Sequence, residues 1–387
     1  MLSPSSRLPW PGAGDQFLLR HDVTFLNHGS FGATPRPVFD TYQRWQRELE
    51  AEPVEFLSRR LPGLLAQART PLAEYVHANP DDLVYIPNTT FGVNIVARSL
   101  DLQPGDEVLG TDHEYGAAER AWRFNCEKRG ARYVAQPIRL PIRDPDHVVE
   151  QLWAGITAQT RVIFLSHITS PTAVIFPVAE VCRRARAAGI LTVVDAAHAP
   201  GHLDLNLGEI GADFYLGNCH KWLSSARGAG FMHARPEVQT LLEPLVVSWG
   251  WRSEWPSHST YQDWYGWTGT DDPSAYLSVP DAIRFQREHN WPAVRAECHA
   301  LIAWSREQFA AITGLPPICP DSMIGQMASL PIPTGTLDRL STRLWDEYRI
   351  EIPHIRWQGH EFLRVSIQAY NSERDVTRLL DAVRASV

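Results

Sequence analysis

The chain has 387 residues, of which 44% are hydrophobic and 21% are charged. A chain of this length and composition can bury a sizeable core without a disulfide or metal staple, and the composition excludes a disordered protein. The formal net charge of −8 argues against a nucleic-acid partner, because nucleic-acid binders usually carry an excess of basic residues.

Five cysteines stand at spacings that match no metal site, and their number is odd. We therefore expect no metal, no disulfide framework and a reducing compartment. No apolar run is long enough to span a membrane, and the start of the chain lacks the apolar stretch of a signal peptide. These features predict a cytoplasmic protein that has no membrane partner.

Short apolar runs alternate with helical patterns along the first two thirds of the chain. The runs predict strands at residues 83–87, 107–110, 161–166, 190–195 and 213–217. Residues 178–188 have a helical pattern that ends at Gly189. Strands separated by helices indicate βαβ units and a mostly parallel sheet, and strands that are apolar throughout are covered by helices on both faces.

The pattern changes near residue 246. Residues 246–273 include five tryptophans among glycines and prolines, and they are too irregular for a helix or an ordinary strand. The remaining chain predicts helices at 281–288, 291–313, 338–348 and from Ser372, and strands at 326–331 and 362–366. We expect an N-terminal segment of residues 1–19, a large domain over 20–270 and a smaller α+β domain over 271–387.

Polar side chains follow the predicted strands of the large domain. Because ligands of open α/β sheets bind beyond the carboxyl ends of the strands, these side chains predict one shared site. In chain order they include Asn88, Thr89, Thr90, His113, Tyr115, Thr169, Asp195, His198, Asn218, His220 and Lys221.

These residue types suit the polar groups of a single ligand. The Asn-Thr-Thr-Phe-Gly stretch before a helix offers hydroxyl and N–H groups to a phosphate, and it lacks the GK[ST] element of a P-loop. Asp195 ends an apolar strand, where its charge requires a cation such as a protonated pyridine nitrogen. Lys221 is expected to be partly desolvated, which favours the neutral amine that attacks a carbonyl. The combination predicts pyridoxal 5′-phosphate (PLP).

The sequence resembles the class V aminotransferase family of PLP-dependent enzymes of fold type I. The resemblance extends from about residue 25 to the C-terminus. It rests on the motifs LNHGSFG (26–32), NTTFGVN (88–94), DHEYGA (112–117), SHITSPT (166–172), VVDAAHAPG (193–201), GNCHKW (217–222) and LRVS (363–366). It implies an α/β large domain, whose mostly parallel sheet is covered by helices, and a smaller C-terminal α+β domain. Within the family, the sequence is most similar to isopenicillin N epimerase-like proteins, whose relatives include C–S lyases.

The resemblance implies roles around the cofactor. Lys221 would form the Schiff base, Asp195 would keep the pyridine nitrogen protonated, and His198 would bind the phenolic oxygen. His113 would stack on the ring, with Tyr115 as its rival. The phosphate would be held by Thr89, Thr90, Asn218 and His220. Thr169 stands near the phenolic oxygen, where cysteine desulfurases have an asparagine.

The resemblance also implies residues for the substrate and for a partner subunit. Arg364 matches the arginine that binds the α-carboxylate of an amino-acid substrate, for which a forked guanidinium is suited. Asn27 and His28 would line the substrate side together with Tyr115. Thr270 matches a segment that reaches the phosphate of the neighbouring subunit in family dimers, which implies a homodimer.

The resemblance leaves three reactions open. Reprotonation of Cα from the opposite face gives epimerisation, protonation of the cofactor at C4′ gives transamination, and loss of a group from Cβ gives a lyase. His113, Tyr115 and His28 are the candidate acids on the face opposite Lys221. A non-catalytic binding protein is the alternative from another class.

The sequence does not support two other activities, cysteine desulfurase and NAD-dependent dehydrogenase. Residues 348–361 contain no cysteine where a cysteine desulfurase has its mobile thiol. An NAD-dependent dehydrogenase lacks support, because no GxGxxG motif opens a βαβ unit.

Overall fold

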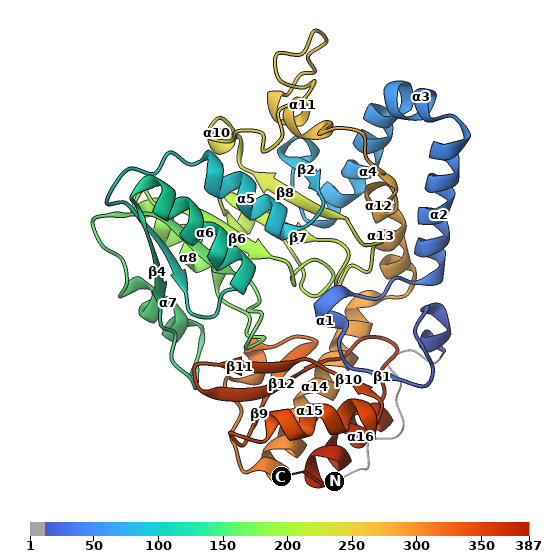
Figure 1. The fold of residues 1–387 in the computed structure, drawn as a ribbon, viewed down its shortest axis with the longest axis vertical. Coiled ribbons are helices and arrows are strands. Elements are labelled where there is room, and N and C mark those ends of the chain that lie inside the picture. Colours follow the sequence, from blue (N-terminus) through green and yellow to red (C-terminus); the bar gives the residue numbers. More distant parts are fainter. Residues whose placement is uncertain (1–11, 387) are drawn as a thin grey trace.

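The computed structural model describes residues 12–386. A seven-stranded sheet occupies the upper part of the molecule in Figure 1, and a three-stranded sheet with its helices occupies the lower part. Helix α1 (His28–Phe31) lies between these two parts (Figure 1).

The large sheet is mostly parallel. Its strands, in spatial order, are β2 (Leu83–Ile86), β8 (Gly230–Ala234), β7 (Phe214–Asn218), β6 (Leu191–Ala196), β5 (Thr160–Ser166), β3 (Glu107–Thr111) and β4 (Arg132–Gln136). Strand β8 runs antiparallel to β2 and β7, and it is the one strand of this sheet whose direction is reversed. The parallel strands end at the same edge of the sheet, so the side chains that follow them come close together.

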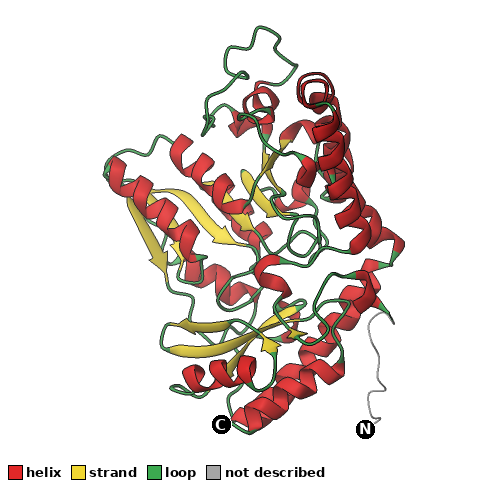
Figure 2. Ribbon diagram, turned by 45° about the vertical axis from the view of Figure 1, so that its right-hand side comes forward, coloured by secondary structure: helices red, strands yellow, loops and turns green. Residues whose placement is uncertain are grey.

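Helices cover both faces of this sheet (Figure 2). They are α5 (Thr89–Ser99), α6 (Gly116–Arg129), α7 (Pro145–Trp153), α8 (Val178–Ala187), α9 (Leu207–Ile210) and α10 (Pro236–Gln239). Neighbouring strand residues enter different cores: Phe164 and Val193 belong to one hydrophobic cluster, and Leu165 and Val194 belong to another. The strands are therefore apolar throughout because each side chain meets a helix layer.

A second group of helices packs beside the sheet. It contains α2 (Arg36–Ala51), α3 (Pro53–Glu55), the π-helix η2 (Phe56–Arg60), α4 (Leu61–Tyr75), α12 (Ser274–Leu277) and α13 (Val279–Glu288). Helices α12 and α13 pack against both α2 and α4. The division of the chain at residue 270 stays a prediction.

The C-terminal part is an α+β unit. Its elements are α14 (Trp291–Thr313), β9 (Met327–Ile332), α15 (Leu337–Asp346), β10 (Ile350–Glu351), β11 (His354–Trp357), β12 (His360–Ser366) and α16 (Glu373–Arg384). Strand β12 is central in an antiparallel sheet. Strand β1 (Thr24–Phe25), at the start of the stretch predicted as the large domain, pairs with β10 of this unit. The predicted N-terminal segment of residues 1–19 lies partly outside the described residues. Short 3-10 turns complete the chain at η1 (Ala13–Gln16), η3 (Pro80–Asp82) and η4 (Asp321–Met323).

The structure confirms the predicted α/β class and adds elements that the sequence did not reveal. The five predicted strands of the large sheet and the helix at 291–313 are present. Strands β4, β8 and β11 were not predicted; β4 and β11 are partly exposed edge strands without a continuous apolar run. Among the described residues, no helix is long and apolar enough to cross a membrane.

The expectation that residues 246–273 contain no helix is wrong. Helix α11 (Thr260–Gly266) lies within this stretch, and the Ser259 side chain caps it by accepting the N–H of Gln262. The helix packs against β2. The preceding loop projects at the top of Figure 1 and exposes Trp249 and Trp255.

Candidate active site

The central strands bring several predicted residues to one edge of the large sheet. Asp195 near the end of β6 pairs in register with Ser166 at the end of β5. Asn218 ends β7, and Lys221 lies in the turn that follows. Polar groups from three neighbouring strands therefore meet at the same sheet edge.

Lys221 lies in a turn that other segments hold in place. The N–H of Ser224 donates to the Lys221 carbonyl at 3.0 Å, and Nε2 of His28 lies 3.0 Å from the same oxygen. Burial, reinforced by the positive charge of Arg364, lowers the pKa of Lys221 to about 8, while Asp195 opposes this shift. The site favours the neutral, nucleophilic amine more than water does.

Two glycines allow motif loops to approach this turn closely. A Cβ atom on Gly32, which has a φ of +70°, would lie 2.2 Å from the His220 carbonyl oxygen. A Cβ atom on Gly201, with a φ of +84°, would lie 2.3 Å from the Leu223 nitrogen. The LNHGSFG and VVDAAHAPG motifs therefore position the lysine by direct backbone packing.

Asp195 is a buried carboxylate that accepts one hydrogen bond from the part of the chain that the structure describes. Its Oδ1 atom accepts the N–H of Ala197 at 2.9 Å. Burial raises the pKa of Asp195, while this hydrogen bond and the charge of Lys221 act in the opposite direction. A cationic ligand group beside the carboxylate would stabilise its ionised form.

His198 links the lysine to the residue that follows it. Its Nε2 atom lies 3.3 Å from Nζ of Lys221, and its Nδ1 atom accepts the indole N–H of Trp222 at 3.2 Å. Burial lowers the pKa of His198 well below its ordinary value. The ring is therefore neutral and joins two neighbours in the lysine turn.

The N-terminus of α5 is prepared for an anion. The Asn88 side chain caps the helix by accepting the N–H of Phe91 at 3.0 Å, and the N–H of Thr89 donates to Oδ1 of Asn218 at 2.9 Å. The Thr89 hydroxyl is buried and has no hydrogen-bond partner among the described residues. Together with Thr90 in the same first turn, it can serve a phosphate at the positive end of the helix dipole.

His220 offers a second nitrogen to such a ligand. Its Nδ1 atom lies 2.8 Å from the Ala229 carbonyl, which accepts from it. Burial lowers the pKa of His220 to about 4. Within residues 12–386, its Nε2 atom makes no hydrogen bond, so this atom is available to a ligand.

Arg364 is a buried cation on the central strand β12. Its Nη1 atom donates to the Ser170 carbonyl at 2.6 Å, and its Nη2 atom donates to the Ser30 hydroxyl at 3.2 Å. Its Nε–H is buried without a partner in the described chain. Burial lowers the pKa of Arg364 to about 10. Since its hydrogen-bond partners in the described chain are neutral, the guanidinium is suited to an anionic ligand group.

His113 and His28 are buried and fully engaged by protein atoms. The two ring nitrogens of His113 contact the Thr172 hydroxyl at 2.6 Å and the Ile138 carbonyl at 2.8 Å. Those of His28 contact the Tyr370 hydroxyl at 2.9 Å and the Lys221 carbonyl at 3.0 Å. Burial lowers the pKa to about 4 for His113 and to about 3 for His28.

Tyr115 has a different environment from these histidines. It occupies the position just before α6 without a side-chain capping hydrogen bond, and 49% of its surface is exposed. Its phenol is near enough to Arg364 to raise the pKa of that guanidinium against the effect of burial. Of the two rivals in the DHEYGA motif, Tyr115 is therefore the one that interacts electrostatically with Arg364.

Two further predicted residues make their contacts outside the lysine turn, and a third is exposed. Asn27 donates from Nδ2 to Glu351 at 2.9 Å, and its Oδ1 atom is buried without a partner among the described residues. The Thr169 hydroxyl interacts with Thr172 and accepts the N–H of Val174 within its own loop. Thr270 is exposed.

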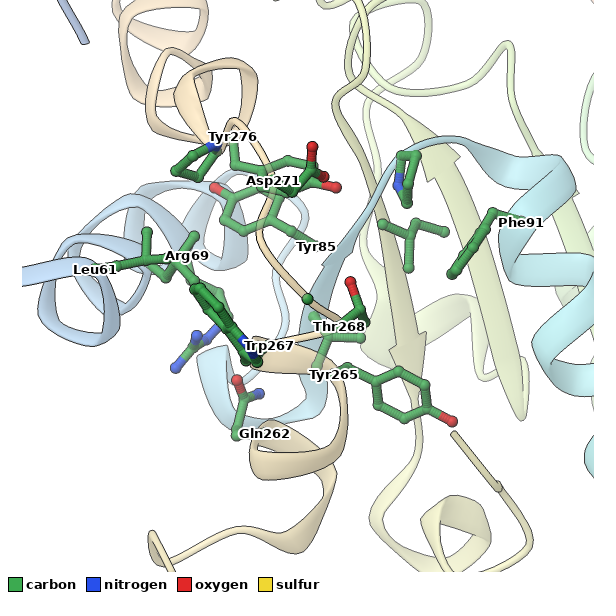
Figure 3. A pocket seen from close by; sticks show the side chains of 17 residues that line it. Leu61, Arg69, Tyr85, Phe91, Gln262, Tyr265, Trp267, Thr268, Asp271 and Tyr276 are labelled. Carbon is green, nitrogen blue, oxygen red and sulfur yellow. The ribbon is translucent and has the colours of Figure 1, made fainter. Parts of the chain in front are cut away.

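A cavity of about 70 Å³ adjoins the loop that contains Thr270 (Figure 3). Phe91 of α5 lies on one side of it, and Thr268 and Asp271 contribute the loop wall. Tyr85 and Tyr276 stack with ring centroids 5.0 Å apart. This loop and Phe91 of α5 therefore border the same cavity.

Sequence reasoning missed Glu114 and gave Trp222 no role. Glu114 accepts hydrogen bonds from the hydroxyls of Thr111 and Ser166, both at 2.6 Å. Burial raises the pKa of Glu114 to about 8, and the charge of Asp195 adds to this shift. Glu114 lies inside a recognised motif, but a single sequence does not show that its carboxyl group is buried.

These residues fit the three polar ends of PLP. The N-terminus of α5, with its unpartnered Thr89 hydroxyl, suits the phosphate. The buried carboxylate of Asp195 suits a protonated pyridine nitrogen, and the Lys221 amine suits the aldehyde carbon. The donor set of the structure thus matches the cofactor that the sequence predicts.

Comparison with known proteins agrees with this match. The family model described as aminotransferase class V matches residues 25–379. An isopenicillin N epimerase from Amycolatopsis lactamdurans is 38% identical over an alignment of 393 positions, which covers 97% of this chain and 98% of that protein. A putative L-cysteine desulfhydrase 1 from Oryza sativa subsp. japonica is 29% identical, over 94% of this chain and 83% of that protein.

A solved structure has the same fold. It is a mutant of C-DES in which glycine is covalently linked to the PLP cofactor. The TM-score is 0.83 at 22% sequence identity, and the superposition covers 96% of this chain and 99% of the other. The chain belongs to the class V aminotransferase family and is a PLP-dependent enzyme of fold type I.

Proposed function

We propose that this enzyme epimerises or racemises the α-carbon of an amino acid or of a substrate derived from one. The observation that carries the proposal is Arg364, a buried guanidinium without a carboxylate partner in the described chain, whose charge acts on Lys221. An α-carboxylate bound at Arg364 would place the α-carbon beside the amine that can remove its proton. The similarity to an isopenicillin N epimerase supports this reaction over its alternatives.

Each residue of the site has a distinct task in this proposal. PLP, when bound, supplies an electron sink for the charge that develops at Cα. Asp195 stabilises the positive charge at the pyridine nitrogen. Arg364 would orient the α-carboxylate, and the neutral Lys221 amine would act as the base on one face of Cα. Thr89 and His220 hold the phosphate.

Epimerisation also requires an acid on the opposite face, and we assign this task to Tyr115. The two other candidates, His113 and His28, are buried and already use both ring nitrogens in contacts with the protein. Tyr115 is half exposed and interacts with Arg364. A tyrosine hydroxyl can deliver a proton when it lies within hydrogen-bond reach of the acceptor.

A C–S β-lyase is the second candidate, supported by the similarity to a putative L-cysteine desulfhydrase. Such an elimination uses the same base and the same carboxylate-binding arginine, and an aminotransferase would use them too. A persulfide-forming desulfurase is not supported, because all five cysteines are buried and unpaired. Burial raises the pKa of Cys126 to about 11 and that of Cys182 to about 12, so these thiols resist ionisation.

We further propose a cytoplasmic homodimer in which Thr270 reaches the phosphate site of the neighbouring subunit. Thr270 is exposed, and its loop borders the cavity beside α5. Trp249 and Trp255 on the nearby projecting loop are 80% and 83% exposed, which is unusual for side chains of this size. The five free cysteines support a reducing compartment.

A product assay separates the candidate functions. The purified protein, supplied with PLP, is incubated with a panel of L- and D-amino acids that includes cysteine and its sulfoxides. The mirror-image amino acid is the result expected for an epimerase. Pyruvate would identify a β-lyase, and a cofactor converted to its amine form would identify an aminotransferase. A protein that stays colourless with PLP would contradict the proposed function altogether.

A further inference from the structure

Trp222 follows Lys221 directly and is fully buried. Its ring centroid lies 4.1 Å from that of His202 and 4.9 Å from that of His28. Its carbonyl accepts a hydrogen bond from the Gln286 side chain at 2.9 Å, which anchors the turn to α13. These contacts hold the indole ring, so its single polar group has a fixed direction.

The indole N–H of Trp222 donates to Nδ1 of His198 at 3.2 Å. Because an indole N–H can only donate, Nδ1 of His198 must be the unprotonated acceptor. Burial keeps the ring neutral by lowering the pKa of His198 well below its ordinary value. The one ring proton therefore belongs to Nε2, which lies 3.3 Å from Nζ of Lys221.

We propose that Trp222 is a positioning residue that fixes His198 in the tautomer whose proton is on Nε2, facing Lys221. An N–H donor at this position interacts favourably with a neutral amine and unfavourably with an ammonium group. Trp222 thus acts through His198 to favour the neutral form of Lys221. Its contribution to turnover rests on the proposed function, whereas the tautomer itself does not.

Other charged groups also influence these two side chains. Arg364 lowers the pKa of Lys221, and Asp195 raises it. The remaining ionisable groups that interact with His198 are Arg364, His202 and His28. A Trp222→Phe variant keeps all of them and removes only the indole N–H with part of the ring. A change in the Lys221 pKa of this variant would therefore report the lost hydrogen bond.

The tautomer can be read from ¹⁵N chemical shifts of the full chain with labelled histidines, in the form without cofactor. A His198→Gln variant assigns the signal. In the unmodified protein we expect an unprotonated Nδ1 and a protonated Nε2 for His198. In Trp222→Phe we expect a mixture of tautomers, because nothing then holds Nδ1 as an acceptor.

Trp122→Phe is a matched control. Trp122 is also fully buried, but its indole N–H has no hydrogen-bond partner in the described chain. We expect the control to leave the His198 signals unchanged. A proton on Nδ1 in the unmodified protein, or an unchanged tautomer in a folded Trp222→Phe variant, would overturn the proposal. If Trp222→Phe fails to fold, the His198 tautomer of the unmodified protein tests the proposal by itself.

The pKa of Lys221 gives a second readout, and the sequence makes it simple to measure. The chain contains only two lysines, Lys128 and Lys221, and Lys128 is exposed. Acetylation by acetic anhydride at different pH values, followed by peptide mass spectrometry, compares the two in one sample. We expect Trp222→Phe to raise the Lys221 midpoint by about one pH unit, the effect of an ordinary hydrogen bond. An unchanged midpoint would contradict the proposal.

These measurements do not depend on the proposed reaction. Both use the protein without cofactor, so a wrong tautomer would leave the assignment of the reaction standing. A failure to bind PLP, in contrast, would contradict the proposed function and leave the tautomer result valid. The two outcomes are therefore distinguishable.

Discussion

Two sets of buried polar residues differ in how completely the protein satisfies them. At His113 and His28, every ring nitrogen contacts a protein atom. In the candidate site, the Thr89 hydroxyl and the Arg364 Nε–H have no partner among the described residues. Because a buried polar group without a partner is costly, a ligand that reaches these two groups would supply the missing contact. Burial alone would have selected both sets; unmet hydrogen-bonding capacity selects only the second.

The largest effect is expected for Lys221→Ala, which removes the amine at the centre of the unsatisfied set. Turnover should fall by about a thousandfold or more, because both the base and the cofactor link are lost. The product assay, together with the visible absorption of the protein mixed with PLP, measures this loss. Lys128→Ala, which changes an exposed lysine, is the control and should behave like the unmodified enzyme.

The next test asks whether Tyr115 or His113 is the acid on the face of Cα opposite Lys221. Tyr115→Phe should lower the rate of epimerisation about a hundredfold, because the acid on one face is lost. Exchange of the Cα proton with deuterium should continue from the Lys221 side. Both rates can be measured by NMR and chiral chromatography. Equal losses of epimerisation and exchange would rule out a role for Tyr115 as the opposite-face acid.

His113→Phe should instead affect stability. The variant removes one of the two hydroxyl contacts of Thr172 and leaves the Ile138 carbonyl without its ring partner, which should cost about 1–3 kcal/mol of unfolding free energy. Urea denaturation measures this change. The ratio of epimerisation to exchange should stay that of the unmodified enzyme. A changed ratio would mean that His113 takes part in the reaction. The difference between satisfied and unsatisfied buried residues would then not identify the residues that act on the substrate.

Arg364→Lys should raise KM by about tenfold to a hundredfold, since a point charge cannot replace the forked guanidinium. Steady-state kinetics with the substrate found in the product assay would show this, with a smaller effect on kcat. Arg356→Lys is a suitable control, because Arg356 is exposed and already pairs with Asp338 and Glu361. An unchanged KM in Arg364→Lys would mean that Arg364 does not bind the α-carboxylate of the substrate.

The smallest predicted effect is the pH dependence of the rate at which the protein takes up PLP. The uptake of PLP by the protein without cofactor requires the neutral Lys221 amine, whose fraction increases as the pH rises toward a pKa of about 8. The uptake rate, followed by visible absorption, should therefore rise with pH and level off above about pH 8. A rate that keeps rising beyond pH 10 would mean that the site does not lower the pKa of Lys221.

The sequence predicted the strands of the large sheet because their apolar runs are continuous. Asp195 and Lys221 could be proposed because their residue types, placed after such runs, suit a cofactor. The sequence could not show which histidines are satisfied by the protein. The partner of His113 is Thr172, 59 positions away, and that of His28 is Tyr370, 342 positions away. Such pairs depend on the tertiary fold and leave no local pattern.

The indole hydrogen bond of Trp222 escaped prediction for a related reason. Trp222 and His198 stand in different motifs, 24 positions apart, and meet because the loops after β6 and β7 pack together. The helix α11 was missed because it is only seven residues long and lies among the tryptophans and glycines of residues 246–273, which obscure the helical period. Residue types can therefore indicate the chemistry of a site before its internal contacts are known.

The central claim is that Lys221 is the residue that binds PLP. The most direct test is to add PLP, remove the unbound cofactor by gel filtration, record the visible spectrum, reduce the protein with borohydride and locate the label by peptide mass spectrometry. The chain has only two lysines, so the assignment is unambiguous. We predict a visible band and a reduced pyridoxyl group on the peptide that contains Lys221. A label on Lys128 alone, or no label and no band, would contradict the claim.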